Sequence, residues 1–450
     1  MTHILEWEKL LSSTRVDRVN NANSPTSDQQ EDDRTAFEQD YDRIVFSQPF
    51  RRLARKTQVH PMASNDHIHN RLTHSIEVAS VGRSFARRLA TLDKLKGVLT
   101  ETQKNSLVWI LQSACLIHDI GNPPFGHAGE EVIRAWVEKH EQELFVGTGL
   151  GSTDQLAKCK TDWLHFEGNA QGFRFSSRAD NPKAGYLRLT YATLGAAIKY
   201  PWSSSDRRAE EKKKHNYYST EDQIFSVMAE ELGLVKSNNQ YCRHPLSFLT
   251  EAADDICYRI IDLEDAVEMG ICDRQVVHDL FSEIARRDKQ NTMPLSQLRG
   301  RAIKSLMDQC WEVFEREFDS IMNGERYDDL KSGLDRECGD LLKSVGEIYG
   351  QIFQHRKKVA TELGAYHVLG RILTAFIKTI RAFNGISEYS KIPFISKRTV
   401  ELTWGQEHVQ ANLDKDYCWW LSQVMDYVSG MTDDYAVRLS KEIGGISYIE

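Results

Sequence analysis

The chain has 450 residues, of which 40% are hydrophobic, and its formal net charge is −8. This length suits two or three average domains or one large one, and the composition is that of an ordinary soluble globular protein. The negative charge argues against a general polyanion-binding surface. No stretch reaches the roughly 18 to 20 apolar residues that a membrane helix needs, so we expect no membrane contact.

The cysteines and the N-terminal residues predict the cellular compartment of the protein. The eight cysteines are scattered along the chain and include no Cys-x-x-Cys pair. The segment from Met1 to Glu8 lacks the basic and then apolar layout of a secretory signal. Together these features predict reduced thiols and a cytoplasmic location.

The elements expected in chain order are almost all helical. Residues 1–35 are expected to form an extended or partly disordered N-terminal arm, because residues 12–34 are polar and without periodicity. From Phe37 onward, apolar residues recur with the 3.6-residue period of amphipathic helices. Strand patterns are scarce, and the best candidate, residues 188–193, also fits a helix. The sequence therefore predicts an all-α fold. The expected helices cover residues 70–92, 105–120, 127–144, 221–233, 246–269, 273–288, 297–323, 338–380 and 415–443.

This all-α fold is expected to divide into a catalytic core over residues 36–270 and additional C-terminal helices over residues 271–450. The C-terminal helices are expected to pack on the core and to supply oligomer or regulatory contacts. Two stretches within the core are predicted to be mobile surface insertions. Residues 145–163 are rich in glycine and polar residues, and residues 203–220 contain the charged run 210–214.

The most informative segment is a histidine–aspartate pair, His118 and Asp119, at the end of the apolar run 107–120. A helix that is apolar nearly all round is a buried helix, and an unpaired carboxylate in such a place is strongly disfavoured. A metal ion would compensate both side chains at once. The pair therefore indicates an active site rather than a structural core.

The residues after this pair predict a sharp reversal of the chain. Gly121 suits the left-handed position after a last helical turn, and Pro123 and Pro124 cannot continue the helix. We expect the reversal to bring His127 and Glu130 back toward the pair.

Two further ligand candidates lie on other predicted helices. His74 lies on an amphipathic helix, where a lone histidine is most often structural or solvent-facing. Asp254, Tyr258 and Asp262 recur every four residues, which fits a solvated helix face as well as the wall of a pocket. Two imidazoles and two carboxylates suit Mn, Fe, Co, Ni or Mg and fit poorly with a closed thiolate zinc site. Four protein ligands also leave positions for water and a phosphate oxygen.

Four segments, in this order, give the chain a specific resemblance. They are residues 71–78 (RLTHSIEV), 118–130 (HDIGNPPFGHAGE), 166–172 (FEGNAQG) and 251–258 (EAADDICY). They resemble the HD-domain phosphohydrolase superfamily, whose signature is His…His-Asp…Asp on helices, and within it the deoxyguanosinetriphosphate triphosphohydrolases. Weaker similarity continues to the end of the chain and includes residues 429–433. The resemblance implies a divalent metal ion held by His74, His118, Asp119 and Asp254.

The resemblance also implies a reaction. The family converts a deoxynucleoside triphosphate, dGTP by default, to the deoxynucleoside and inorganic triphosphate by attack of water at the α-phosphorus. His127 is the expected general acid or base, and Glu130 is expected to orient its ring. The alternative is that His127 caps the helix and Glu130 only favours its positive N-terminus.

Substrate contacts are expected from several elements. Arg71 is the first choice for a phosphate contact, and Lys199 is a weaker one. Tyr258 is expected to close the 2′ side of the sugar, and Asp262 to accept from the 3′-hydroxyl. The amides in this set could instead bond local backbone. The expected substrate-binding residues are Gln58, Val59, Arg71, Asn169, Lys199, Tyr258 and Asp262.

Partners and competing functions remain open at this point. The family is oligomeric, commonly hexameric, and some members respond to nucleotides or single-stranded DNA, so a homo-oligomer with such a regulatory ligand is expected. The basic cluster 51–56 is either a solvated face or a contact for such an anion. The alternatives are another HD phosphohydrolase or a catalytically silent nucleotide-sensing or nucleic-acid-binding HD protein. The chain lacks the early Glu-Asp pair of guanosine-polyphosphate hydrolases and the Gly-Tyr-Pro motif of cyclic-dinucleotide phosphodiesterases, and it keeps all four expected ligands.

Overall fold

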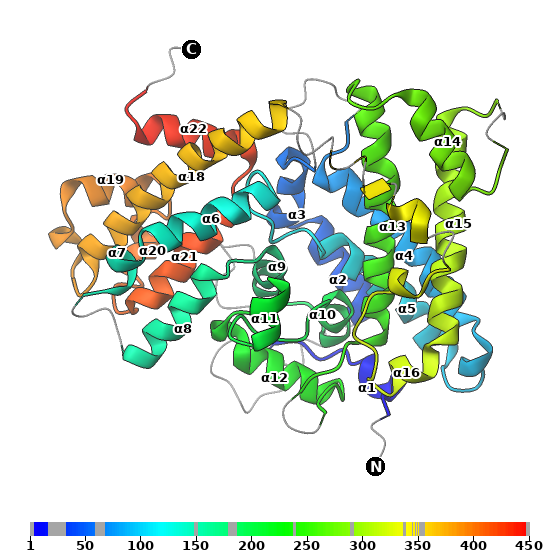
Figure 1. The fold of residues 1–450 in the computed structure, drawn as a ribbon. Helices are drawn as coiled ribbons and strands as arrows, with labels where there is room; N and C mark the ends of the chain where they lie inside the picture. Colours follow the sequence, from blue (N-terminus) through cyan, green and yellow to red (C-terminus); the bar gives the residue numbers. More distant parts are fainter. Residues whose placement is uncertain are drawn as a thin grey trace.

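The computed structural model describes residues 4–16, 33–58, 68–147, 152–178, 187–236, 240–288, 292–335 and 356–446, with parts of 339–350. Nearly all of this chain is helical (Figure 1), and among the described residues only isolated bridges, such as Thr57 with Asn70, pair extended backbone. The all-α prediction is confirmed. The helices are α1 (Trp7–Leu10), α2 (Ala36–Val45), α3 (Gln48–Arg52), α4 (Arg71–Ala90), α5 (Glu101–Ile117), α6 (His127–Lys139), α7 (Glu141–Phe145), α8 (Thr153–Leu164), α9 (Gly168–Ser177), α10 (Tyr191–Ala197), α11 (Arg207–Lys212), α12 (Asp222–Glu231), α13 (Pro245–Glu268), α14 (Arg274–Ile284), α15 (Leu295–Arg316), α16 (Phe318–Met322), α18 (Arg356–Phe383), α19 (Phe394–Leu402), α20 (Gln406–Gln410), α21 (Tyr417–Ser429) and α22 (Asp433–Ile443).

Local signals explain where the helices that carry the candidate site begin. α4 begins after Asn70, whose side chain accepts two backbone N–H groups of the first turn, and α5 begins after Thr100 in a capping box. α13 carries Pro245 in its first turn, where the missing N–H has no partner to lose. These starts place His74 in the first turn of α4 and Asp254 in the middle of α13.

One hydrophobic cluster, called here the first cluster, surrounds α5. This helix packs along α4 and also contacts α2, α10 and α13. Its residues Leu107, Ile110, Leu111 and Ala114 have no exposed surface, which confirms the prediction of a buried helix. α13 in turn packs on α15 (Figure 1), so α14 to α16 extend the same cluster.

A second cluster lies around the long helix α18, on the opposite side of the molecule from α14 and α15 in Figure 1. α18 packs on α6, α19, α21 and α22. Trp136, Phe376, Trp420 and Leu421 form part of its buried interior. The C-terminal helices expected as one region therefore contribute to both clusters: α14 to α16 to the first, and α18 to α22 to the second.

The N-terminal arm differs from expectation. Residues 4–16 contain α1 and pack into the first cluster, with Leu10 completely buried and Trp7 nearly so. Arg15 forms an ion pair with the buried carboxylate of Asp40. The polar composition of residues 12–34 concealed the short apolar run that precedes it. Residues 17–32 lie outside the described part of the chain.

The two expected insertions also differ from expectation. Within residues 145–163, helix α8 begins after the N-cap Ser152. Within residues 203–220, Ser204, His215, Tyr217 and Tyr218 are all buried. Asp162 of α8 joins the two stretches, because it accepts from the backbone N–H of Ser219 at 3.1 Å and from Ser204 Oγ. The described part of each stretch therefore includes a segment packed into the fold, although 152–155 and 210–213 are exposed.

Two smaller predictions can also be compared with the structure. The strand candidate at residues 188–193 is not a strand, because α10 begins at Tyr191. In the described part of the chain, no helix combines the length and the apolar character that crossing a membrane requires.

Candidate metal centre and active-site cavity

A cavity of about 640 Å³ is lined by residues of both clusters. Phe125 and Val132 of the second cluster face it, as does Tyr258, which packs on the first cluster. The residues predicted for the site that line this cavity are Gln58, Arg71, His118, Asp119, His127, Glu130, Asn169, Lys199, Asp254 and Tyr258.

His118 is held in one orientation at the end of α5. It is the C-cap residue of this helix, and its Nδ1 donates to the carbonyl of Cys115 at 2.7 Å. With the proton on Nδ1, the lone pair of Nε2 is free to bind a cation. Nε2 is buried and has no hydrogen-bond partner among the described residues. This orphaned nitrogen is the observation that best fits a bound metal ion.

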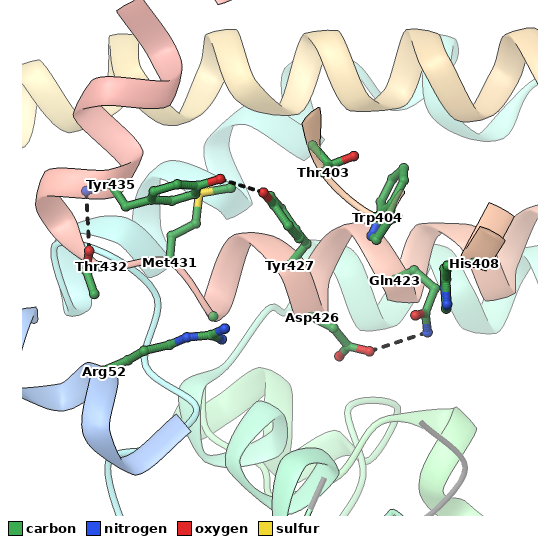
Figure 2. Close-up of a pocket in the computed structure, with 11 residues that line it drawn as sticks. Arg52, Thr403, Trp404, His408, Gln423, Asp426, Tyr427, Met431, Thr432 and Tyr435 are labelled. Carbon is green, nitrogen blue, oxygen red and sulfur yellow. Dashed lines mark hydrogen bonds between the residues drawn. The ribbon is translucent and has the colours of Figure 1, made fainter. Parts of the chain in front are cut away.

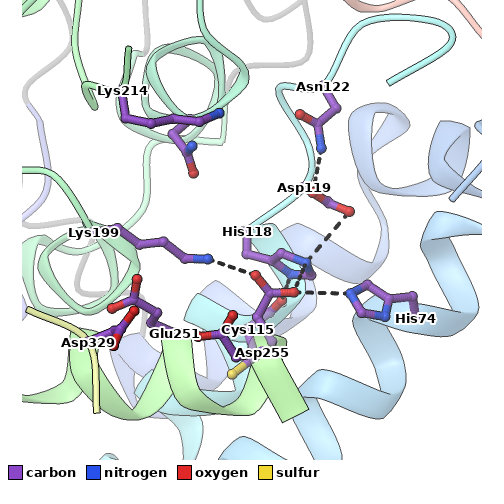
Figure 3. Close-up of polar contacts among 12 residues, drawn as sticks. His74, Cys115, His118, Asp119, Asn122, Lys199, Lys214, Glu251, Asp255 and Asp329 are labelled. Carbon is purple, nitrogen blue, oxygen red and sulfur yellow. Dashed lines mark hydrogen bonds and ion pairs between the residues drawn. The ribbon is translucent and has the colours of Figure 1, made fainter. Parts of the chain in front are cut away.

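Three further side chains surround that nitrogen. His74, His118 and Asp119 each offer one ligand atom, and these atoms lie within 4.8 Å of one another. Oδ1 of Asp254 lies 3.2 Å from His74 Nε2 and 3.4 Å from His118 Nε2. Figure 3 shows His118 between Asp119 and His74, with their polar atoms turned toward one another. The structure thus brings together all four predicted ligands.

Two cations compensate the carboxylates of this cluster. Arg71 Nη1 donates to Asp119 at 2.5 Å, and Lys199 Nζ donates to Asp254 at 2.7 Å. Burial alone would raise both carboxyl pKa values. The guanidinium of Arg71 nevertheless holds the pKa of Asp119 well below its usual value, and the ammonium of Lys199 does the same for Asp254. Both groups are therefore ionised at neutral pH, the form that binds a cation.

The turn between α5 and α6 is shaped by close backbone contact with α9. A Cβ atom on Gly121 would lie 2.0 Å from the backbone nitrogen of Gly172 and 2.2 Å from the carbonyl oxygen of Gly168. The expected left-handed conformation at Gly121 is wrong: the positive φ angles fall on Phe125 (66°) and Gly126 (59°). Gly121 is required for this close approach and not for its backbone angle.

The reversal brings His127 onto the cavity wall together with Glu130. His127 is the first residue of α6, its side chain is 72% exposed, and its Nδ1 lies 2.9 Å from Glu130 Oε2. Glu130 is buried and also accepts from the backbone N–H of Gly168 at 2.8 Å. The N-cap position belongs to Gly126 and no side chain caps this helix, so His127 does not serve as a cap.

Charge around Glu130 keeps it ionised. Burial opposes ionisation, but the hydrogen bond with His127 and the nearby ammonium of Lys214 lower the pKa of Glu130 to about 2. An ionised, buried carboxylate fixes the orientation of the imidazole and leaves the other ring nitrogen of His127 toward the open side.

Sequence reasoning missed Lys214, which lines the cavity on the same side as Lys199 in Figure 3. Its ammonium donates to Glu167 Oε1 at 2.5 Å and lies 4.0 Å from Glu130 Oε2. Lys214 belongs to the charged run that suggested a solvated insertion. Sequence alone carried no signal that this lysine turns inward.

The remaining predicted substrate residues divide into three groups. Gln58 lines the cavity, and its Oε1 is buried with no hydrogen-bond partner in the described chain. Asn169 also lines it and donates to the Glu167 carboxylate at 2.9 Å rather than to local backbone. Asp262 is completely buried and does not line the cavity, so its contact with a sugar stays a prediction. Val59 lies outside the described residues.

Helix α18 closes the cavity with Thr361 and Glu362. These residues lie on the helix around which the second cluster is built, far along the chain from the histidine–aspartate motif. No motif singled them out, because on sequence grounds they are ordinary polar positions of an amphipathic helix.

Comparison with known proteins agrees with this geometry. The model of the HD domain matches residues 71–148, which carry His74, His118 and Asp119. An all-α fold with this paired motif around a cavity defines the chain as an HD-domain phosphohydrolase.

Relatives similar over most of the chain narrow the class. A deoxyguanosinetriphosphate triphosphohydrolase-like protein of Pseudomonas aeruginosa is 38% identical and covers 98% of this chain and 99% of its own. A protein of the same name from Synechocystis sp. is 34% identical over 98% and 100%. A deoxyguanosinetriphosphate triphosphohydrolase of Klebsiella pneumoniae is 30% identical over 85% and 88%. The chain therefore belongs to the deoxyguanosinetriphosphate triphosphohydrolase-like family.

Proposed function

We propose that this protein hydrolyses deoxynucleoside triphosphates, dGTP by preference, to the deoxynucleoside and inorganic triphosphate. The observation that carries this proposal is the shared cavity, which is lined by residues of the His/Asp cluster, by the His127–Glu130 pair and by two lysines. A metal ligand set, an acid–base group and phosphate-binding cations are the parts that hydrolysis of a phosphate ester requires.

The metal centre is proposed to consist of His74, His118, Asp119 and Asp254. A divalent ion bound there would polarise a phosphate oxygen and lower the pKa of a coordinated water. The nitrogen and oxygen donors suit Mn, Mg, Fe, Co or Ni. Arg71 and Lys199 keep both carboxylates ionised before any ion binds.

His127 is proposed to transfer the proton that the reaction needs at the cavity. The candidate reacting atom is its exposed ring nitrogen, because the other is engaged by Glu130. Positioned imidazoles typically contribute about 10² to 10⁴-fold to such reactions. Glu130 is proposed to act through His127 by fixing its ring.

The triphosphate is proposed to lie against Lys199 and Lys214, which approach the cavity from the same side in Figure 3. Arg71 is largely committed to Asp119, since it is only 4% exposed, so its main role is to orient that ligand. Two lysine ammonium groups can offset the charge of a triphosphate where it emerges from the metal centre.

The nucleoside is proposed to fill the rest of the cavity. Tyr258 is a planar wall that can pack against the 2′ carbon and exclude a ribose hydroxyl. Gln58 has an amide oxygen that needs a donor, which a sugar hydroxyl can supply. Glu362 on α18 offers a carboxylate, the acceptor that matches the N1–H and amino group of guanine.

The test uses purified protein loaded with Mn²⁺ and each of the eight common dNTPs and NTPs, with products resolved by chromatography. The expected products are deoxynucleoside and tripolyphosphate, with dGTP the fastest substrate and GTP much slower because of Tyr258. Release of a monophosphate and pyrophosphate would overturn the proposed reaction. Equal rates for dGTP and GTP would remove the role of Tyr258.

The oligomeric state and the cellular location of the protein are also matters of proposal. We propose a cytoplasmic homo-oligomer that responds to a nucleotide or to single-stranded DNA, on the basis of family membership alone. Size-exclusion chromatography with light scattering tests the first part, and activity with and without each ligand tests the second.

A further inference from the structure

Two buried polar residues lie behind the catalytic turn and have no role so far. Lys56 is 2% exposed, and its Nζ donates to the carbonyl of Asn122 at 2.6 Å and to that of Ser429 at 2.5 Å. One carbonyl belongs to the turn after Asp119 and the other to the last residue of α21. Although the cluster 51–56 suggested surface cations, Lys56 is an internal tie between two distant parts of the chain.

Asp433 forms a second tie at the same place. Its side chain accepts from the backbone N–H of Phe125 at 2.9 Å and from the backbone N–H of Thr57 at 3.0 Å. It also accepts from Thr57 Oγ1 at 2.6 Å. Asp433 is the first residue of α22 and is 3% exposed. Both ties therefore join the α21–α22 corner to the turn between Asp119 and His127.

The α21–α22 corner is itself held firmly, as Figure 2 shows. Tyr427 and Tyr435 hydrogen-bond through their hydroxyls at 2.7 Å, and the Thr432 side chain caps α22. Arg52 packs so closely that a Cβ atom on Gly430 would lie 2.7 Å from its Nη1. Because these contacts hold the α21–α22 corner in place, the segments that hydrogen-bond to it are also held in fixed positions.

The turn between Asp119 and His127 connects this corner to the metal centre. The Asn122 side chain donates to Asp119 Oδ1, and the Asn122 backbone N–H donates to the Asp119 carbonyl at 3.2 Å. The other end of the turn, at Phe125, leads directly into His127. Neither Lys56 nor Asp433 lines the cavity, so neither contacts a substrate there.

We propose that Lys56 and Asp433 are positioning residues that fasten the α21–α22 corner to the catalytic turn and thereby hold Asp119 and His127 in register across the cavity. This proposal rests on the proposed function for its effect on turnover, but not for its effect on metal binding. Groups that orient metal ligands typically change affinity or activity by about 10 to 100-fold when removed.

The test compares Asp433→Ala with Asp434→Ala. Both residues lie in the first turn of α22, so their interaction with the helix N-terminus is matched. Asp434 is exposed and pairs only loosely with exposed Arg55, at 3.6 Å. The measurements are the Mn²⁺ dissociation constant of substrate-free protein, by electron paramagnetic resonance of free Mn²⁺, then kcat and KM for dGTP, and the thermal unfolding temperature.

Asp433→Ala is expected to weaken Mn²⁺ binding and to lower kcat, each by about 10 to 100-fold, with KM nearly unchanged. Asp434→Ala is expected to stay within about twofold of the wild type in all of them. A folded Asp433→Ala protein with wild-type Mn²⁺ affinity and kcat would overturn the proposal, since a purely structural residue would lower only the unfolding temperature.

A milder variant covers the case in which Asp433→Ala does not fold. Thr57→Val removes the hydroxyl bond to Asp433 and keeps the backbone one, and we expect an Mn²⁺ dissociation constant about 3 to 10-fold higher. Thr57 also lines the cavity, so the readout is Mn²⁺ affinity of substrate-free protein rather than turnover. Wild-type affinity in Thr57→Val would then overturn the proposal. If the wild type hydrolyses no dNTP, the proposed function fails, while the Mn²⁺ comparison still decides the positioning role.

Discussion

The cavity wall that carries the candidate metal ligands and the wall that carries His127 differ in burial and in charge compensation. On the metal wall, His74 and His118 are buried, and the carboxylates Asp119 and Asp254 are each neutralised by a cation. On the opposite wall, His127 is 72% exposed and only its supporting carboxylate is buried. A metal ligand must keep one fixed place and charge, whereas an acid–base group must reach a proton and exchange it. The contrast supports the proposed roles without reference to any relative.

The largest expected effect breaks the metal wall. Asp119→Asn keeps the shape of the side chain but removes its charge, and His118→Ala removes the orphaned nitrogen. Both variants are expected to lose bound metal and at least about 10³-fold of turnover, because the ion supplies the main charge of the site. Metal analysis and dNTP turnover measure this. Stoichiometric metal with normal activity in either variant would refute the ligand assignment.

The next prediction tests His127 separately from the metal ligands. His127→Ala should lower kcat by about 10² to 10⁴-fold while leaving Mn²⁺ affinity unchanged, because the imidazole transfers a proton and binds no ion. Electron paramagnetic resonance of free Mn²⁺ provides the control. A wild-type kcat would reduce His127 to a structural residue at the start of α6, and a lost ion would move it to the metal wall.

A smaller effect is expected on the KM for dGTP when Lys214, which lines the cavity, is replaced. Lys214→Met is expected to raise KM for dGTP about tenfold with little change in metal content, because one cation facing the triphosphate is removed. Lys213→Met is the matched control, since Lys213 is the preceding residue and is exposed. Equal KM values in the two variants would place the triphosphate elsewhere.

A further effect, on stability in acid rather than on turnover, concerns Glu130. The pKa of Glu130 falls from its ordinary value of 4.5 to about 2 in the folded protein. The stabilisation is therefore present above pH 4.5 and is lost as the pH falls from about 4.5 to about 2. Glu130→Gln lacks this contribution, at most about 3 kcal/mol. Urea unfolding at pH 7 and pH 3 should show a larger loss for the wild type, and parallel losses would contradict the buried, ionised carboxylate.

The fold was largely predictable wherever one helix shows its own period. α4, α5, α13 and α21 were expected because their apolar residues repeat over many turns. α1 was not expected, since four residues are too few to show a period, and it is held by tertiary burial of Trp7 and Leu10. α8 was missed because the glycine-rich sequence 147–151 that precedes its N-cap Ser152 suggested a loop. The segment around Tyr217 was missed because burial orders it and no local period shows this.

The site was predictable only where chemistry is concentrated in short motifs. His118, Asp119 and His127 lie within ten residues of one another, so their association can be inferred from the chain. Asp433 contacts Thr57 across 376 positions, and no local pattern reveals such a contact. Lys214 was visible as a charge but not as an inward-facing one, because direction depends on the partner Glu167.

The contact of Gly121 with Gly172 has a consequence for the shape of the cavity. Where side chains separate two walls, a rotamer change or a displaced water can absorb a small misfit. Here the backbone of the turn after Asp119 contacts the backbone of α9 directly. No side-chain rotamer can therefore change the spacing between this turn and α9. A methyl group added at Gly121 would overlap the backbone of α9, the helix that carries Asn169, so the turn or α9 would have to move. The spacing between the turn and α9 is therefore set by main chain, and exchange of the side chains that line the cavity leaves it unchanged.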